Sequence, residues 1–140
     1  MITPNDFLVQ SKDLLNLYGA KENNETYLRS AVSRAYYALF HEAKKQLEAK
    51  HKREFDEAYA KLTGQGKSTK STAGVSMHRV VRDALRNIKN GNAAFISQKF
   101  YGYKDLRNTA DYELNENFGY DDVAAKVDGM QNLIAQIKNI

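Results

Sequence analysis

The chain has 140 residues, a net charge of +4 and no cysteine. This length is typical of a single domain that folds around its own core, and the lack of cysteine excludes a disulfide framework, a thiolate nucleophile and a cysteine-based zinc site. The sequence has no apolar run near the ~20 residues of a membrane span, and its first residues, "MITPNDFLVQSK", lack the basic and apolar parts of a secretory leader. We therefore expect a soluble protein of the cytoplasm.

The first predicted helix begins at Pro4, the only proline of the chain. Thr3 suits the N-cap position, Pro4 suits the first helical position, and Asp6 places a negative charge near the positive end of the helix dipole. Apolar residues then recur at helical spacing until Gly19, where we expect the helix to end.

A second helical pattern runs from Asn23 or Asn24 to about Leu62 and predicts the central helix. One stripe along it is apolar, as expected for the face that a helix turns to the core. The stripe consists of Leu28, Ala31, Val32, Ala35, Leu39 and Ala43, with Tyr36 and Phe40 at its edge. A helix of ~40 residues is unusually long, so we predict a break within "EAKHKREFDE".

The rest of the chain predicts a loop followed by three further helices. Residues 63–75 are rich in Gly, Ser and Thr, which is typical of a flexible surface loop. The later helices are expected in "SMHRVVRDALRNIKN", from about Ala94 to Asn115 and from about Asp121 to Ile137, with turns at Asn90–Asn92 and near Gly119. No segment alternates apolar and polar residues as a strand does. The sequence therefore predicts one all-α domain over residues 1–140, with four or five helices.

Charge is distributed unevenly along the chain. Residues 41–90 contain 12 Lys and Arg against 6 Asp and Glu, whereas residues 105–128 contain 7 acidic residues against Arg107 and Lys126. A basic region can attract an anionic partner such as nucleic acid, and an acidic region can contact a basic protein surface. Solvated helix faces that segregate by charge explain the same pattern without a partner.

A polar strip lies opposite the apolar stripe of the central helix. At ~100° per residue, the strip brings one arginine, one histidine, one lysine, one tyrosine and one serine into line. Its members are Ser30, Arg34, Tyr37, His41 and Lys45. Such a set can bind a phosphodiester and stack a base. It can equally form hydrogen bonds to neighbouring helices and water.

The segment "KDLRNTADYEL" places a second polar cluster on the helix predicted around residue 107. Arg107 and Asp111 are four residues apart and can pair, and Asn108 and Tyr112 have the same spacing one step round the helix. Neither a phenol nor a carboxylate beside a guanidinium is a good general base near neutral pH. The residues by themselves therefore indicate an anion-positioning or structural cluster.

Two segments together resemble the small all-α HEPN domains (higher eukaryotes and prokaryotes nucleotide-binding). They are "YLRSAVSRAYYALFHEAK" at residues 27–44 and "YKDLRNTADYEL" at residues 103–114, with "SMHRVV" between them. The resemblance covers roughly Asp6 to Ile137 and the segments occur in the same order. It implies an antiparallel helical bundle that forms a homodimer, with the arginine-bearing helices of two chains across a shared cleft.

The resemblance also implies a function. Many HEPN domains are metal-independent endoribonucleases of toxin–antitoxin pairs, phage defence or RNA processing, and some are partnered by a minimal nucleotidyltransferase. In their motif an arginine, often followed by asparagine, holds the scissile phosphate, and a histidine four to six residues after the arginine moves a proton. Arg107 and Asn108 match this motif, but Tyr112 stands where the histidine is expected. His41 or His78 would then have to act from another helix.

Two functions follow as alternatives, and a purely structural helical bundle is a third reading, since each polar cluster also has a structural role. One function is an RNA-directed protein of a toxin–antitoxin or phage-defence system, either a degenerate ribonuclease or one in which Arg107, Asn108, Tyr112 and His41 act in cleavage without a metal or cofactor. The other is a non-catalytic dimeric module that binds a nucleotide, a minimal nucleotidyltransferase or an antitoxin. In either case, the residues expected to bind the ligand are Arg34, Tyr37, Lys45, His78 and Asp111.

Overall fold

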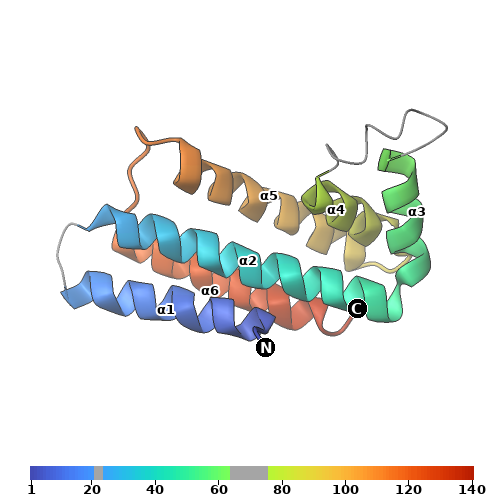
Figure 1. The fold of residues 1–140 in the computed structure, drawn as a ribbon, viewed down its shortest axis with the longest axis horizontal. Coiled ribbons are helices and arrows are strands. Elements are labelled where there is room, and N and C mark those ends of the chain that lie inside the picture. Colours follow the sequence, from blue (N-terminus) through green and yellow to red (C-terminus); the bar gives the residue numbers. More distant parts are fainter. Residues whose placement is uncertain (21–23, 64–75) are drawn as a thin grey trace.

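The computed structural model describes residues 1–20, 24–63 and 76–140. These residues form six α-helices and no strand, which confirms the all-α prediction (Figure 1). The helices are α1 (Pro4–Ala20), α2 (Glu25–Lys50), α3 (Lys52–Thr63), α4 (Met77–Asn87), α5 (Ala93–Tyr112) and α6 (Tyr120–Ile137). The expected number of four or five is too low, because the long pattern in the first half of the chain forms two helices. Of the predicted loop, Thr63 belongs to α3, and residues 64–75 lie outside the described residues.

The start of α1 confirms the predicted N-cap. The backbone N–H and the hydroxyl of Thr3 both donate to Oδ2 of Asp6, at 2.6 and 2.9 Å. The carboxylate of the third helical residue thus accepts from the N-cap N–H, as in one half of a capping box, while the Asp6 N–H donates to the backbone carbonyl of Thr3 at 3.0 Å. The same hydrogen bonds lower the pKa of Asp6 below its ordinary value, chiefly through the backbone donor. The helix ends at Ala20, one residue beyond the predicted Gly19.

The predicted break of the long helix lies at His51. Its φ of −135° and ψ of 45° leave the helical region, and its N–H still donates to the carbonyl of Leu47 at 2.8 Å. The next helix, α3, turns away from the axis of α2 and packs against α4 (Figure 1). Phe55 and Ala58 of α3 are buried in the core on this side of the bundle.

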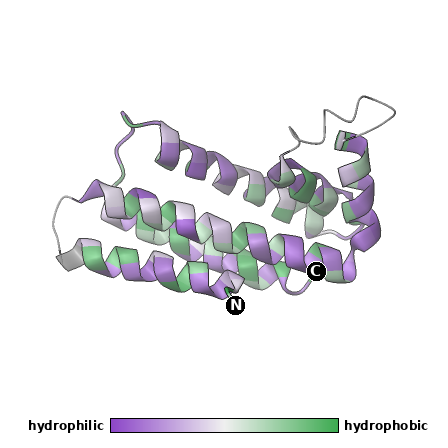
Figure 2. Cartoon of the chain, in the orientation of Figure 1, coloured by the Kyte–Doolittle hydropathy of each residue, from purple (hydrophilic) through white to green (hydrophobic). Residues whose placement is uncertain are grey.

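Helix α2 is the centre of the fold and contacts each of the other five helices. Every residue of its predicted apolar stripe is buried, and Tyr36 and Phe40 at the edge of the stripe are buried too. Figure 2 shows green, hydrophobic positions along α1, α2 and α6, whereas the later part of α5 is largely hydrophilic. All six helices contribute buried apolar residues to one core, with most of them on α2 and α6, and the later part of α5 presents a more polar surface.

The bundle is only partly antiparallel. Arg29 near the start of α2 lies next to Phe118 before α6, and Lys50 at the end of α2 donates to the carbonyl of Lys138 after α6. Helices α2 and α6 therefore run in the same direction, while α1 and α5 run opposite to both (Figure 1). Helices that follow one another in this set of four are therefore antiparallel, and the neighbours α2 and α6 are parallel. None of the described helices is long and apolar enough to cross a membrane.

Candidate functional site

Arg107 lies on the face of α5 that packs against α2 and is only 9% exposed. Its Nη1 is 3.5 Å from Oδ2 of Asp111, so the predicted pair is present, at a long distance. The guanidinium also lies over two rings of α2, with its carbon 5.4 Å from the centre of Tyr36 and 5.9 Å from that of Tyr37. Its Nε is buried and has no hydrogen-bond partner among the described residues. This arginine thus has a spare donor beside two aromatic rings.

His78, on α4, also contacts Tyr36. Its Nδ1 is 2.6 Å from the Tyr36 hydroxyl, and its ring packs on those of Tyr36 and Phe40, with centroids 5.4 and 4.3 Å apart. Burial, together with the charges of Arg107, Lys104 and His41, lowers the pKa of His78 to about 4. Burial also raises the pKa of the Tyr36 phenol. Near neutral pH the phenol therefore donates to Nδ1, and the imidazole keeps its proton on Nε2.

The exposed imidazole of His41 lies between other rings of α1 and α2. Its centroid is 5.3 Å from that of Phe7, 5.1 Å from that of Phe40 and 6.4 Å from that of Tyr37. Partial burial lowers the pKa of His41, and the neighbouring charge of Lys44 acts in the same direction. His41 is therefore a neutral, accessible imidazole at neutral pH, whereas His78 is a neutral imidazole held inside.

The polar strip of α2 borders two hollows. The first, which we call the α2–α5 hollow, has a volume of about 410 Å³ and is lined by Ser30, Arg34 and Tyr37 from the strip and by Asp111 from α5. The second has a volume of about 450 Å³ and is lined by residues that include His41 and Lys45. The two meet at the neighbouring rings of Tyr37 and His41. All five strip residues thus border solvent-filled space along one helix.

Arg34 differs from the other arginines around this surface. In the part of the chain that the structure describes, Arg34 has no hydrogen bond and no ion pair, and it is half-buried in the wall of the α2–α5 hollow. Arg107 is already engaged by Asp111, and Asp111 also accepts from the hydroxyl of Ser33 at 3.4 Å. Among the described residues, the free cation of the hollow is therefore Arg34.

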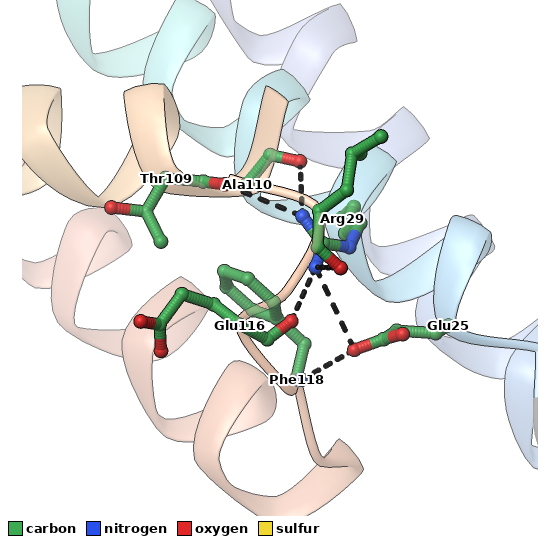
Figure 3. Close-up of polar contacts among 7 residues, drawn as sticks. Glu25, Arg29, Thr109, Ala110, Glu116 and Phe118 are labelled. Atoms are coloured by element: carbon green, nitrogen blue, oxygen red, sulfur yellow. Dashed lines mark hydrogen bonds and ion pairs between the residues drawn. The ribbon is translucent and has the colours of Figure 1, made fainter. Parts of the chain in front are cut away.

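Arg29 is a structural residue of the site that the sequence did not predict (Figure 3). It donates to the carbonyls of Thr109 at 3.3 Å, Ala110 at 2.9 Å and Leu114 at 3.4 Å, and also to that of Glu116. The helix α5 ends at Tyr112 and not at the predicted Asn115, and Arg29 supplies donors to carbonyls of its last turn and of the segment that follows.

Further contacts hold Arg29 in this position. Its guanidinium carbon lies 4.7 Å from the centre of the Phe118 ring, and its Nη2 lies 3.8 Å from Glu25, whose carboxylate accepts from the N–H of Phe118 at 2.7 Å (Figure 3). The end of α5 that carries Asp111 is therefore fixed to the start of α2. The Glu25–Arg29 spacing was a local signal of an ion pair, but it could not reveal acceptors about 80 residues further along the chain.

The remaining predicted site residues lie apart from this cluster. Tyr112 is the last residue of α5 and is 72% exposed, so its side chain lies in solvent and not with Arg107 and His78. Asn108 is half-buried on α5, one position beyond Arg107. Of the expected residues, the structure brings together Arg107, Asp111, Tyr37, His78 and His41, and it adds Tyr36 as the residue that joins them.

The site contains no metal centre within the described ranges, where no group of three or more His, Cys, Asp or Glu side chains could hold an ion. Comparison of the chain with protein families, curated proteins and solved structures found no match.

Proposed function

We propose that the chain is an RNA-directed protein of the HEPN type, which binds a single-stranded RNA segment along the α2 strip. The observation that carries the proposal is the α2–α5 hollow, where the free guanidinium of Arg34 and the ring of Tyr37 line one space of about 410 Å³. A volume of this size lies within the range of small-molecule sites and suits one nucleotide.

The chemistry of the strip supports a nucleotide chain. A phosphate requires a cation or N–H donors, and Arg34 has donors that no side chain or carbonyl of the described chain uses. Tyr37 offers a ring on which a base can stack, and such stacking tolerates any base. Lys44 and Lys45 line the adjoining hollow and add positive charge for a neighbouring phosphate.

Titration of a labelled oligouridine at several salt concentrations tests the proposal, with fluorescence anisotropy as the readout. For Arg34→Gln, the slope of log Kd against log salt should fall by about 0.7, because the variant neutralises one phosphate fewer on the single strand. Arg53→Gln is the matched control, because Arg53 is an exposed arginine of α3, at the far end of α2 (Figure 1). An equal effect of both substitutions, or no binding by the wild type, would contradict the proposal.

A second candidate function is metal-independent cleavage of the bound RNA, which the two neutral imidazoles favour. His41 would accept the proton of a ribose 2′-hydroxyl as the 2′-oxygen bonds to phosphorus. The 5′-oxygen would leave and take a proton from water. Arg107 would hold the scissile phosphate after release from Asp111.

In this proposal a homodimer places two such arginines across one cleft, as the HEPN resemblance implies. Analytical sedimentation of the purified chain tests whether it forms this dimer.

A further inference from the structure

Glu42 is a buried acid outside the proposed RNA site. It lies on α2 and is 3% exposed. Its Oε1 is 3.6 Å from Nζ of Lys138, which is longer than a hydrogen bond, and its Oε2 is buried with no partner among the described residues. A buried carboxylate is ordinarily satisfied by several donors, so this oxygen requires an explanation.

The acid lines a pocket of about 270 Å³ at the junction of α1, α2 and α6, which we call the α1–α2–α6 pocket. Lys45 and Lys138 provide two cations in its wall, and Lys45 makes no ion pair or hydrogen bond to any described residue. Asn5, in the first turn of α1, adds a backbone N–H that no carbonyl of the helix can accept from. The pocket wall therefore contains one carboxylate oxygen without a hydrogen-bond partner, Oε2 of Glu42, and donors without an acceptor among the described residues, on Lys45 and at the N–H of Asn5.

These groups define the chemistry of a ligand. The free oxygen of Glu42 requires an N–H donor, and an ammonium group is the strongest match. A polyamine is disfavoured because Lys45 and Lys138 would repel its further charges. A carboxylate on the same molecule would instead use those lysines and the N–H of Asn5. Leu8 and Ile134 provide an apolar wall for the remainder of the molecule.

We propose that the α1–α2–α6 pocket binds a small zwitterion with an ammonium group, a carboxylate and an aliphatic side chain, which is the chemistry of a free aliphatic amino acid. The pocket is slightly smaller than typical drug-sized sites, in keeping with so small a ligand. This inference does not depend on RNA binding, because it uses a different pocket that shares only Lys45 with the RNA strip, and Glu42→Gln should leave the affinity for oligouridine unchanged.

Titration of the ¹⁵N-labelled full chain with L-leucine, L-isoleucine and L-valine in turn tests the proposal. At least one should give saturable shifts at the amides of Asn5, Leu8 and Ile134. The same titration with 4-methylpentanoate, which lacks the ammonium, and 3-methylbutylamine, which lacks the carboxylate, should show affinity lower by about tenfold or more. No saturable shift with any of the three amino acids, or analogues that bind as tightly as the amino acids, would overturn it.

Two variants locate the bound groups. Glu42→Gln should weaken amino acid binding by about tenfold or more, while Glu48→Gln, an exposed acid of the same helix, should leave it unchanged. Lys45→Ala should weaken binding of the amino acid but not of 3-methylbutylamine, because only the carboxylate contacts this lysine. Lys45 is exposed, so this result stands even if Glu42→Gln fails to fold. Unchanged binding in Lys45→Ala would contradict the assigned orientation and, with it, the zwitterion.

Discussion

The hydroxyl of Tyr36 on α2 lies 2.6 Å from Nδ1 of His78 on α4, although 42 positions separate the two residues in the chain. This hydrogen bond gives a fully buried phenol its acceptor and fixes the tautomer of a half-buried imidazole. Arg107 lies over the Tyr36 ring, so one residue connects the histidine of α4 to the arginine of α5. The contact has consequences for stability, pH dependence and activity.

Tyr36→Phe removes the donor and leaves Nδ1 of His78 without a partner. We expect the free energy of unfolding to fall by about 1 kcal/mol, measured by urea denaturation. Tyr37→Phe is a matched control on the neighbouring residue, whose hydroxyl makes no hydrogen bond in the described structure, and it should change stability by less than about 0.5 kcal/mol. Equal losses in the two variants would show that the Tyr36–His78 hydrogen bond contributes nothing specific.

Stability should fall as the pH is lowered from 6.5 to about 4. Because the pKa of His78 is lowered from its ordinary 6.5 to about 4, the unfolded chain binds this proton more readily than the folded chain across that window. The contribution of the neutral His78 to the free energy of unfolding is fully present above pH 6.5 and is lost as the pH falls toward 4. The full shift would correspond to about 3 kcal/mol, and solvent screening of the half-buried ring reduces it to about 1–2 kcal/mol.

Urea denaturation of wild type and His78→Asn at pH 7, 5 and 4 measures this contribution. The difference in unfolding free energy between the two proteins should shrink as the pH falls, because only the wild type has the lowered pKa. Carboxylates that titrate in the same range affect both proteins alike and cancel in the difference. A difference independent of pH would mean that His78 titrates normally.

The Arg107–Asp111 pair should respond asymmetrically to substitution. Asp111→Ala leaves the buried guanidinium uncompensated and should lower stability by about 3 kcal/mol. Arg107→Met leaves Asp111 partly exposed, where water can solvate it, and keeps apolar packing on Tyr36, so a loss of about 1 kcal/mol is expected. Asp56→Ala, in an exposed pair with Lys52, is the control and should cost less than about 0.5 kcal/mol. A larger loss for Arg107→Met than for Asp111→Ala would contradict this asymmetry.

Arg29 should control the opening of the segment that follows α5. Arg29→Ala removes donors from four carbonyls and should reduce amide exchange protection at residues 113–118 and at the end of α5, with a loss of about 2–3 kcal/mol in the local opening free energy. Arg29→Lys keeps the charge but not the fork of donors, so it should restore only part of the protection. Amides of α1 serve as the internal control. Uniform loss of protection across the chain would indicate a global effect and not a local one.

Cleavage is tested with labelled single-stranded and transfer RNA in the presence of a chelator. If the second candidate function is correct, wild type cuts, and both Arg107→Ala and His41→Gln reduce the rate by at least about a hundredfold. Tyr112→Phe should retain the wild-type rate, because Tyr112 lies in solvent. Binding without cleavage by a folded wild type would identify a non-catalytic module for RNA, a nucleotide or a nucleotidyltransferase partner.

The sequence by itself predicted the features that depend on neighbouring residues. Helical periodicity is local, so the all-α class and the buried stripe of α2 could be predicted from spacing. The N-cap position of Thr3 followed from residue types at the helix start, and the break near His51 followed from the length of the helical pattern. The Arg107–Asp111 pair could also be predicted, since residues four apart share a helix face whatever the fold.

Which distant residues meet depends on how the helices pack together in the folded chain. The parallel course of α2 and α6, and with it the approach of Lys138 to Glu42, depends on the path of the chain between helices, which periodicity does not encode. Tyr36 was expected only at the edge of the apolar stripe, yet packing of α4 and α5 against α2 brings it into contact with both His78 and Arg107. Tyr112 matched a motif position but lies in solvent at the last residue of α5, where no other helix of the described residues packs over its side chain. Such contacts depend on how side chains of separate helices fill the same space and share hydrogen-bond donors. The residue pattern within a single helix does not show which residues of other helices it will contact.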